Sequence, residues 1–150
     1  MPITVLDNPN RPITRWAAPR SGQWTEITNW TAGLPGPGRD AVIDLPGSYT
    51  VTVGGTVFAE SMRFEPPSAG PVLRVTGEFT LNDVSRVGPN GVMDLDWGSV
   101  SGRGRLDMAG RLEGQGTFDN AGVVVESTGR GTARVGPFTF NGPVFNAGLL

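Results

Sequence analysis

The stretch from Gly104 to Gly122 carries a repeat in which a large apolar side chain returns every six positions. The repeated residues are Leu106, Leu112 and Phe118; each precedes an acidic residue and has a glycine four positions after it. A period of six fits neither the helical period of about 3.6 nor a simple hairpin, but it fits a chain winding in short straight sides with glycine at the corners. The repeat therefore predicts a β-solenoid.

Alternation within each side indicates which residues face the interior. Successive side chains of an extended strand point to opposite faces, so we expect Leu106 and Met108 inside the coil and Arg105 and Asp107 in water. Glycine suits the corners because a sharp turn often requires a positive φ, which glycine adopts without a Cβ clash. The alternative is a flexible glycine-rich linker, but such linkers do not carry evenly spaced Leu and Phe.

Further short strands are expected along the rest of the chain, divided by glycine and proline. Their expected positions are residues 49–57 with a break at Gly54 and Gly55, 72–75, 79–81, 84–87 and 92–97. A helical turn over residues 58–64 is left open, and residues 66–71 are expected to form a loop. These elements predict an all-β fold.

A motif that is repeated at a longer interval also favours stacked coils. Asn120 and Asn146 each open an Asn-Ala-Gly segment that is followed by two apolar residues. Asparagines at a corner can hydrogen-bond between coils, or they can simply tolerate the left-handed conformation of a turn. We favour the second explanation.

The composition excludes several classes of function. All twelve basic residues are arginine, there is no histidine or cysteine, and the formal net charge is −2. A chain with this charge lacks the basic stripe that nucleic acid or an anionic membrane requires. Without Cys and His, it can form neither a metal centre built on these ligands nor a Ser-His-Asp or Cys-His catalytic group. We expect no nucleic-acid partner and no cofactor.

The N-terminal part contains two tryptophans that can close one end of a solenoid. Trp24 and Trp30 are six positions apart, and each can cover on the order of 200 Å² of apolar surface. Burial in such a cap is the favoured interpretation. If the rings were exposed, they could instead serve as platforms for carbohydrate.

The same region resembles the opening of large bacterial surface and autotransporter-type β-helix proteins. The matching residues are Trp24, Asn29, Trp30, Gly33, Pro35, Gly38, Asp40, Val42, Ile43 and residues 49–53. The glycine-rich text that begins at Gly91 is similar to the repeats of those proteins. The resemblance implies a right-handed β-helix with coils of about twenty residues or more, at a cell surface or outside the cell.

The expected organisation is one continuous domain. Residues 1–21 are interpreted as an irregular N-terminal arm, residues 22–65 as the tryptophan-containing cap with the first strands, and residues 72–150 as the glycine-rich coils. No run approaches the roughly 20 apolar residues of a membrane span, so no membrane insertion is expected.

The best group of carboxylates is Asp94, Asp96 and Asp107, because Asp94 and Asp96 share one face of a strand. Paired carboxylates can hydrolyse glycosides or bind calcium. However, acids that alternate with arginines are more often the solvated face of a coil. We favour the solvated face and expect neither catalysis nor a bound metal.

Three functional hypotheses follow. The first is a non-enzymatic structural or assembly module of a bacterial cell-surface or extracellular protein, the second is a phage or virus-like particle component, and the third is a carbohydrate-binding or carbohydrate-active module. Phe145, Leu149 and Leu150 are expected at the C-terminal end of the coils, where an uncovered apolar edge favours self-association or a protein partner. A surface glycan is a further candidate partner.

Overall fold

The computed structural model describes residues 11–118, 124–127, 133–134, 138–140 and 144–146, and after Thr117 it describes backbone strands without their side chains. Within these residues the secondary structure is almost entirely β, and the one helical segment is a single 3₁₀ turn, η1 (Ile27–Asn29). The strands form two sheets, and all paired strands run parallel.

Seven strands form the first sheet. In spatial order they are β1 (Ile13–Arg15), β3 (Asp40–Ile43), β6 (Met62–Phe64), β9 (Ser85–Val87), β11 (Arg105–Met108), β13 (Val124–Ser127) and β16 (Val144–Asn146). Because strands that are adjacent in the sheet are never consecutive in the chain, the chain must leave the sheet after each strand and return one layer further on.

Nine strands form the second sheet. They are β2 (Gly22–Gln23), β4 (Thr50–Val53), β5 (Thr56–Ala59), β7 (Val72–Val75), β8 (Glu78–Leu81), β10 (Val92–Gly102), β12 (Arg111–Phe118), β14 (Ala133–Arg134) and β15 (Phe138–Phe140). In the early coils this side of the solenoid consists of two strands with a corner between them, such as β4 and β5, whereas β10 and β12 each run through the corner as one strand.

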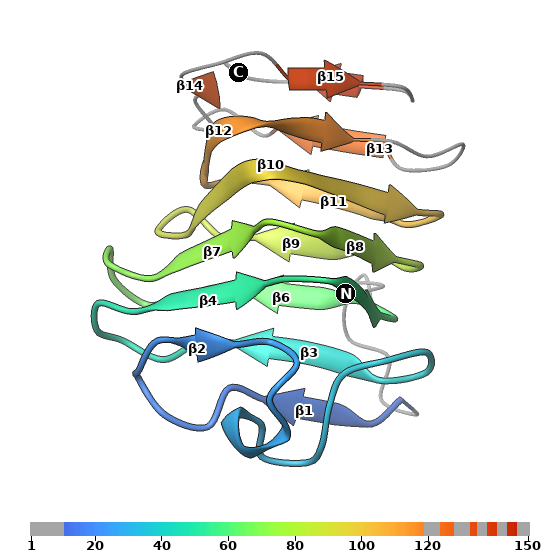
Figure 1. Ribbon diagram of the computed structural model, residues 1–150. Helices are drawn as coiled ribbons and strands as arrows, with labels where there is room; N and C mark the ends of the chain where they lie inside the picture. Colours follow the sequence, from blue (N-terminus) through green and yellow to red (C-terminus); the bar gives the residue numbers. More distant parts are fainter. Residues whose placement is uncertain (1–10, 119–123, 128–132, 135–137, 141–143, 147–150) are drawn as a thin grey trace, which may run out of the picture.

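The two sheets stack as the faces of a β-solenoid, which confirms the predicted fold class. In Figure 1 the strands of the nine-stranded sheet lie in front and run left to right, those of the seven-stranded sheet lie behind and run right to left, and the chain climbs from β1 towards β15. This is a right-handed winding, as the family resemblance implied, and it follows the strong preference for right-handed connections between parallel strands.

The register gives the length of a coil. Leu73 pairs with Met93 and Met93 with Leu112, so one complete coil takes about twenty residues. This spacing falls at the short end of the range for repeat architectures. Of the two asparagines in the repeated Asn-Ala-Gly segments, Asn146 lies in β16 in register with Ser127. Asn120 lies outside the described residues.

The six-residue period corresponds to one side of a coil. Leu106 lies in β11 and Leu112 in the first half of β12, on different sides, and both are buried. Gly110 lies at the corner between these strands, and Gly116 lies at the bend within β12. The inward phase predicted for Leu106 and Leu112 is therefore confirmed, while the side chain of Phe118 lies outside the described residues.

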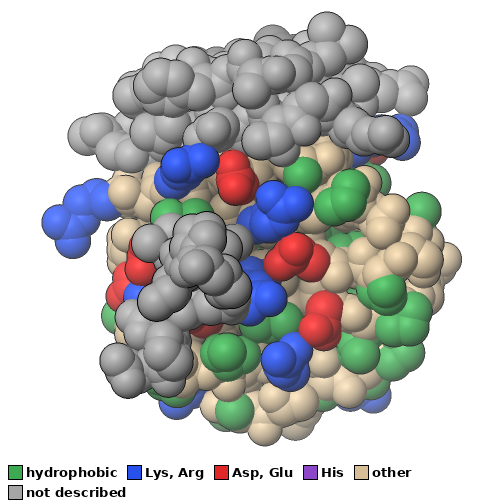
Figure 2. Space-filling view, turned by 180° about the vertical axis from the view of Figure 1, so that it is seen from behind, with side chains coloured by type: hydrophobic (Ala, Val, Ile, Leu, Met, Phe, Trp, Pro, Cys, Tyr) green, Lys and Arg blue, Asp and Glu red, His purple; other side chains and the backbone are tan. Residues whose placement is uncertain are grey.

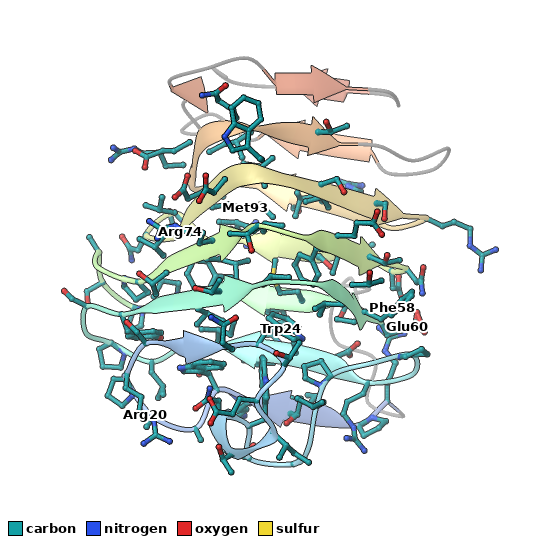
Figure 3. All side chains as sticks on the ribbon, viewed as in Figure 1. Arg20, Trp24, Phe58, Glu60, Arg74 and Met93 are labelled. Atoms are coloured by element: carbon teal, nitrogen blue, oxygen red, sulfur yellow. The ribbon has the colours of Figure 1, made fainter. Side chains whose placement is uncertain are left out.

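The core fills the space between the two sheets with alternate residues of each strand. Figure 3 shows Trp24 and Met93 within the coils, whereas Arg74 and Phe58 lie at their outer surface. The largest fully buried side chains include Phe64, Phe79, Leu73, Leu81, Met62 and Leu95. Stacking coils of nearly constant length buries one layer of apolar side chains on the next.

Charged side chains cover the outer face of the seven-stranded sheet. Figure 2, which looks at the molecule from behind, shows arginines and acidic side chains alternating on this face. Glu65 accepts hydrogen bonds of 3.2 Å from Arg63 in its own coil and from Arg86 in the next coil, and Asp107 lies 3.8 Å from Arg86. Each exposed pair contributes about 1 kcal/mol or less.

The N-terminal region differs from the expectation in two places. Within the segment expected to be an irregular arm, Ile13–Arg15 forms β1 and pairs with β3, because the alternating burial of this strand places Thr14 in the core. The helical turn left open for residues 58–64 is not formed: β5 and β6 occupy this segment and pair with the next coil. Residues 1–10 lie outside the described part.

Candidate functional site

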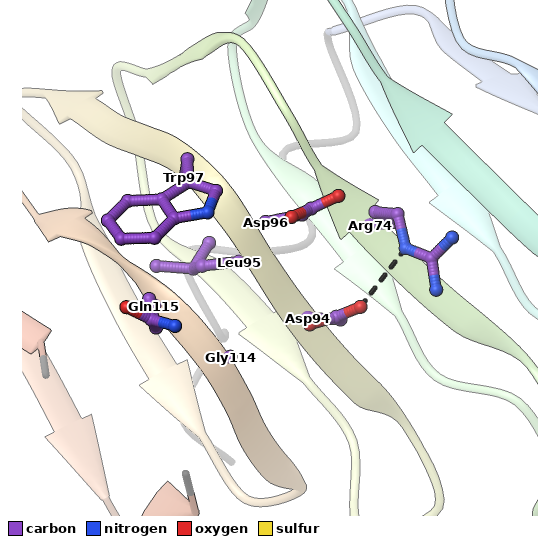
Figure 4. Close-up of a pocket in the computed structure, with 7 residues that line it drawn as sticks. All are labelled: Arg74, Asp94, Leu95, Asp96, Trp97, Gly114 and Gln115. Atoms are coloured by element: carbon purple, nitrogen blue, oxygen red, sulfur yellow. Dashed lines mark hydrogen bonds and ion pairs between the residues drawn. The ribbon is translucent and has the colours of Figure 1, made fainter. Parts of the chain in front are cut away.

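An open polar cleft of about 340 Å³ lies on the outer surface of the nine-stranded sheet. Its lining residues are Arg74 from β7, Asp94, Leu95, Asp96 and Trp97 from β10, and Gly114 and Gln115 from β12. Figure 4 shows these side chains across three consecutive strands, so one ligand could contact three coils at once.

The cleft is produced by a β-bulge in β10. Leu95 pairs with Gly114 and Asp96 with Gln115, and the register then shifts so that Ser99 pairs with Thr117. Trp97 and Gly98 together therefore oppose the single residue Gly116. β10 also has one residue more than the preceding coil over this stretch, because Leu95 pairs with Val75 and Ser99 with Glu78. A bulge of this kind redirects the side chain of the extra residue.

Trp97 is the residue that the bulge turns outward. Its φ of 62° makes it the one non-glycine residue with positive φ in the described part of the chain, and 73% of the residue is exposed. The left-handed conformation is unfavourable for a bulky side chain, and exposing an indole forfeits its burial energy. Strain of this kind, on the order of 1–3 kcal/mol, occurs preferentially at binding sites.

Polar groups line the wall beside the indole. Arg74 Nε donates a hydrogen bond of 3.0 Å to Asp94 Oδ2, so these two charges are paired. Asp96 is exposed and its carboxylate has no ion pair or side-chain hydrogen bond with the described residues, and in the view of Figure 4 it lies between Trp97 and Arg74. Gln115 adds an amide that can donate and accept.

Glu113, the acidic residue next to Asp94 on the neighbouring strand, forms an ion pair of its own. Glu113 is in register with Asp94, and its carboxylate contacts Arg111 Nη2. Asp94 and Glu113 are thus each matched to an arginine, whereas Asp96 is not. The cleft therefore carries one uncompensated negative charge.

The structure brings together only part of the predicted carboxylate group. Asp94 and Asp96 line the same cleft, as their positions in one strand predicted, but Asp107 lies in β11 of the other sheet. There its carboxylate faces Arg86 and Arg105. Among the described residues, no three acidic side chains are grouped so that they could hold a metal ion.

The predicted tryptophans lie in the core and not at the surface. Trp24 and Trp30 are 1% and 5% exposed, and their rings meet edge to face at 4.8 Å. Trp30 Nε1 donates to the carbonyl of Trp24, and Trp16 packs against Trp30. They cannot serve as a carbohydrate platform. Of the predicted association residues, Phe145 lies in β16 with its side chain undescribed, and Leu149 and Leu150 lie outside the described residues.

Trp97, Arg74 and Gln115 were not expected at a site, although the sequence contains a signal for Trp97. Met93 and Leu95 set an alternation that would place Trp97 inside, whereas the next buried apolar residue is Val100, which is out of phase. A change of phase within one strand indicates a bulge, and the residue at the change is turned outward. Arg74 and Gln115 are brought in only by the coil register.

Comparison of the chain with protein-family models, with curated proteins and with solved structures gives no match. Within the described residues, no helix has the length and apolar character needed to cross a membrane. The assignment of a role to this molecule therefore depends on the geometry of the cleft and of the coils.

Proposed function

We propose that this chain is a non-enzymatic structural β-solenoid module that displays a saccharide-binding cleft around Trp97. The observation that carries the proposal is the exposed indole, held in a strained conformation by a bulge beside carboxylate and amide groups. An aromatic face can stack on the apolar face of a pyranose ring, while carboxylates, amides and guanidinium groups bind its hydroxyls. The parallel coils provide a rigid support for both.

The arrangement of the two acids favours binding over catalysis. Asp94 and Asp96 extend from one face of a single strand, so they approach a ligand from the same side. The two carboxyl groups of a glycoside hydrolase flank the bond that is cleaved, and Asp94 is in addition paired with Arg74. We therefore assign both acids to recognition of the ligand.

The location proposed for the module is the cell surface of a bacterium or the extracellular space, with a phage or virus-like particle as the alternative. Support comes from the likeness of the sequence around Trp24 and Asp40 to bacterial surface β-helix proteins and from a right-handed solenoid with that family's coil length. A surface glycan is the partner that best suits the cleft in this setting.

Isothermal titration with neutral tetrasaccharides of glucose and of N-acetylglucosamine tests the binding function. We expect saturable binding with a Kd on the order of 1 mM or tighter, equivalent to roughly 4 kcal/mol, which Trp97→Ala abolishes. Trp97→Gly removes the same ring without the conformational strain and should abolish binding equally. The proposal is rejected if no saccharide class binds, or if the Trp97 variants bind as well as the native chain.

A second proposed function is association through the ends of the solenoid. Among the described residues no strand extends the sheets beyond β16, β14 and β15, and at the opposite end β5 pairs with β8 alone. An apolar groove of about 190 Å³ lies beside β5 and includes Leu34, Pro35 and the partly exposed Phe58. Unpaired edges next to apolar surface favour strand addition by a second copy.

Analytical ultracentrifugation tests this association. We expect the native chain to self-associate with increasing concentration, and deletion of residues 145–150 to reduce association more than it reduces the thermal stability. A Phe58→Asp variant should weaken association from the opposite end, because a charge at the edge disfavours strand addition. A chain that remains monomeric at every concentration would exclude the proposal.

A further inference from the structure

We infer that the Trp97 cleft selects saccharides that carry a free amino group over neutral and acidic saccharides. The inference rests on the proposed saccharide-binding function and adds the chemical class of the ligand. Three features of the cleft carry it: the balance of its charges, the position of the indole and the lack of an ionic partner for Asp96 among the described residues.

The charges of the cleft do not cancel. Arg74 is the one cation among the lining residues, and its Nε is bound to Asp94 at 3.0 Å. The nearby Arg111 contacts Glu113. Asp96 is left exposed without an ionic partner among the described residues. A ligand ammonium group would supply the missing positive charge, and a uronate or sulfate would add a second, uncompensated negative charge.

The exposed indole of Trp97 also favours a positively charged group on the ligand. Trp97 follows Asp96 directly in the chain and lines the same cleft with 73% of its surface exposed. A cation over a tryptophan face is attracted by the negative face of the ring. A sugar that stacks on Trp97 and directs its amino group towards Asp96 would satisfy both groups at once, which a neutral sugar cannot do.

A calcium ion fits the cleft less well than an ammonium group. Calcium takes six to eight oxygen ligands, whereas one of the two carboxylates here is engaged by Arg74, and no group of three acidic side chains exists among the described residues. A single ammonium needs only one carboxylate and an aromatic face. The observed residues therefore favour an organic cation.

The experiment compares three tetrasaccharides of similar shape by isothermal titration: β-1,4-linked glucosamine, its fully N-acetylated form and the glucose polymer. We expect the glucosamine oligomer to bind about fivefold more tightly than the other two, from one exposed ion pair and one cation–π contact. The preference should shrink in high salt. It should also disappear when the pH is raised until the sugar amines are neutral, because a neutral amine is no longer attracted to a carboxylate.

Two variants separate a specific site from general attraction to an acidic protein. Asp96→Asn should remove the preference for glucosamine and leave binding of the neutral oligomers, whereas Asp107→Asn, which removes the same charge from the opposite sheet, should change nothing. Neutral oligomers that bind at Trp97 as tightly as glucosamine would overturn the inference and leave the proposed function intact. Failure of all three oligomers to bind would reject both.

Discussion

Replacement of Gly77 by alanine is expected to lower the free energy of unfolding by about 3 kcal/mol, the upper part of the range for overpacked interiors. Gly77 lies at the corner between β7 and β8. A Cβ built there would collide with the backbone oxygen, nitrogen and carbonyl carbon of Gly55 in the preceding coil. Backbone atoms held in a ladder of hydrogen bonds cannot move aside as a flexible side chain can.

The collision repeats along the corner, which is why its effect should be large. A Cβ at Gly98 would meet the carbonyl of Val75, and one at Gly116 would meet the carbonyl of Gly98. The coils therefore cannot shift to relieve the collision at one layer without tightening the contact at the next. The carbonyl of Gly55 cannot move aside either, because it accepts a hydrogen bond of 2.7 Å from Glu78 N–H. At Gly77, Gly98 and Gly116 the stacking distance of the coils leaves no room for a Cβ.

Gly36→Ala provides the matched control. Gly36 lies in the loop before β3, has no left-handed backbone conformation, and a Cβ there has no neighbour within 4 Å. Its replacement should change stability by about 0.5 kcal/mol or less, as at an ordinary surface position. The two variants can be compared by urea denaturation. Similar midpoints for both would show that the coils can separate at this corner, contrary to the packing described.

The fold was predictable because a solenoid is built from local, repeated constraints. Leu106 and Leu112 are buried because alternation and glycine corners repeat every six residues. This pattern can be recognised in the sequence without knowing which coils are neighbours. The contribution of Ile13–Arg15 to the first coil was less predictable, because the strand is short and is defined by its pairing with β3. The sequence of either segment alone does not indicate that the two strands pair.

The candidate site was predictable only in part, because it depends on register. The proximity of Asp94 and Asp96 follows from a single strand, but the approach of Arg74 and Gln115 depends on coils whose lengths are set by their loops. Asp107 was assigned to the wrong group for the same reason: it is close in sequence to Asp96 but lies beyond a corner. The outward position of Trp97 was signalled by the change of apolar phase between Leu95 and Val100, which only a bulge explains.

The strain at Trp97 and the burial of the other tryptophans suggest a division of roles among identical side chains. Trp16, Trp24 and Trp30 form one edge-to-face cluster in the first coils, and Trp97 lies apart from them at the bulge. The cluster covers the apolar interior at the N-terminal end, which is what a solenoid requires of a cap. A molecule that retains an exposed indole at a conformational cost must gain from it elsewhere, and ligand binding is the gain we propose.

This division can be measured by truncating Trp24, for which we expect a loss of about 3–5 kcal/mol, as for other buried large aromatics. Trp24 is 1% exposed, and its ring meets both Trp30 and Phe79 edge to face, the latter at 4.9 Å. Removing it would leave a cavity between the cap and the coil of Phe79 that neither neighbour can fill without losing its own contacts.

The matched comparison is Trp97→Ala, which removes the same side chain from the surface. It should change the unfolding free energy by about 0.5 kcal/mol or less, because the indole makes few contacts that folding buries. Urea midpoints report stability and titration with glucosamine tetrasaccharide reports binding, so the two variants should give opposite results: Trp24→Ala unfolds earlier yet binds while folded, and Trp97→Ala is stable yet does not bind. Equal destabilisation by the two substitutions would mean that Trp97 packs against the coils, and its assignment as an exposed platform would then be wrong.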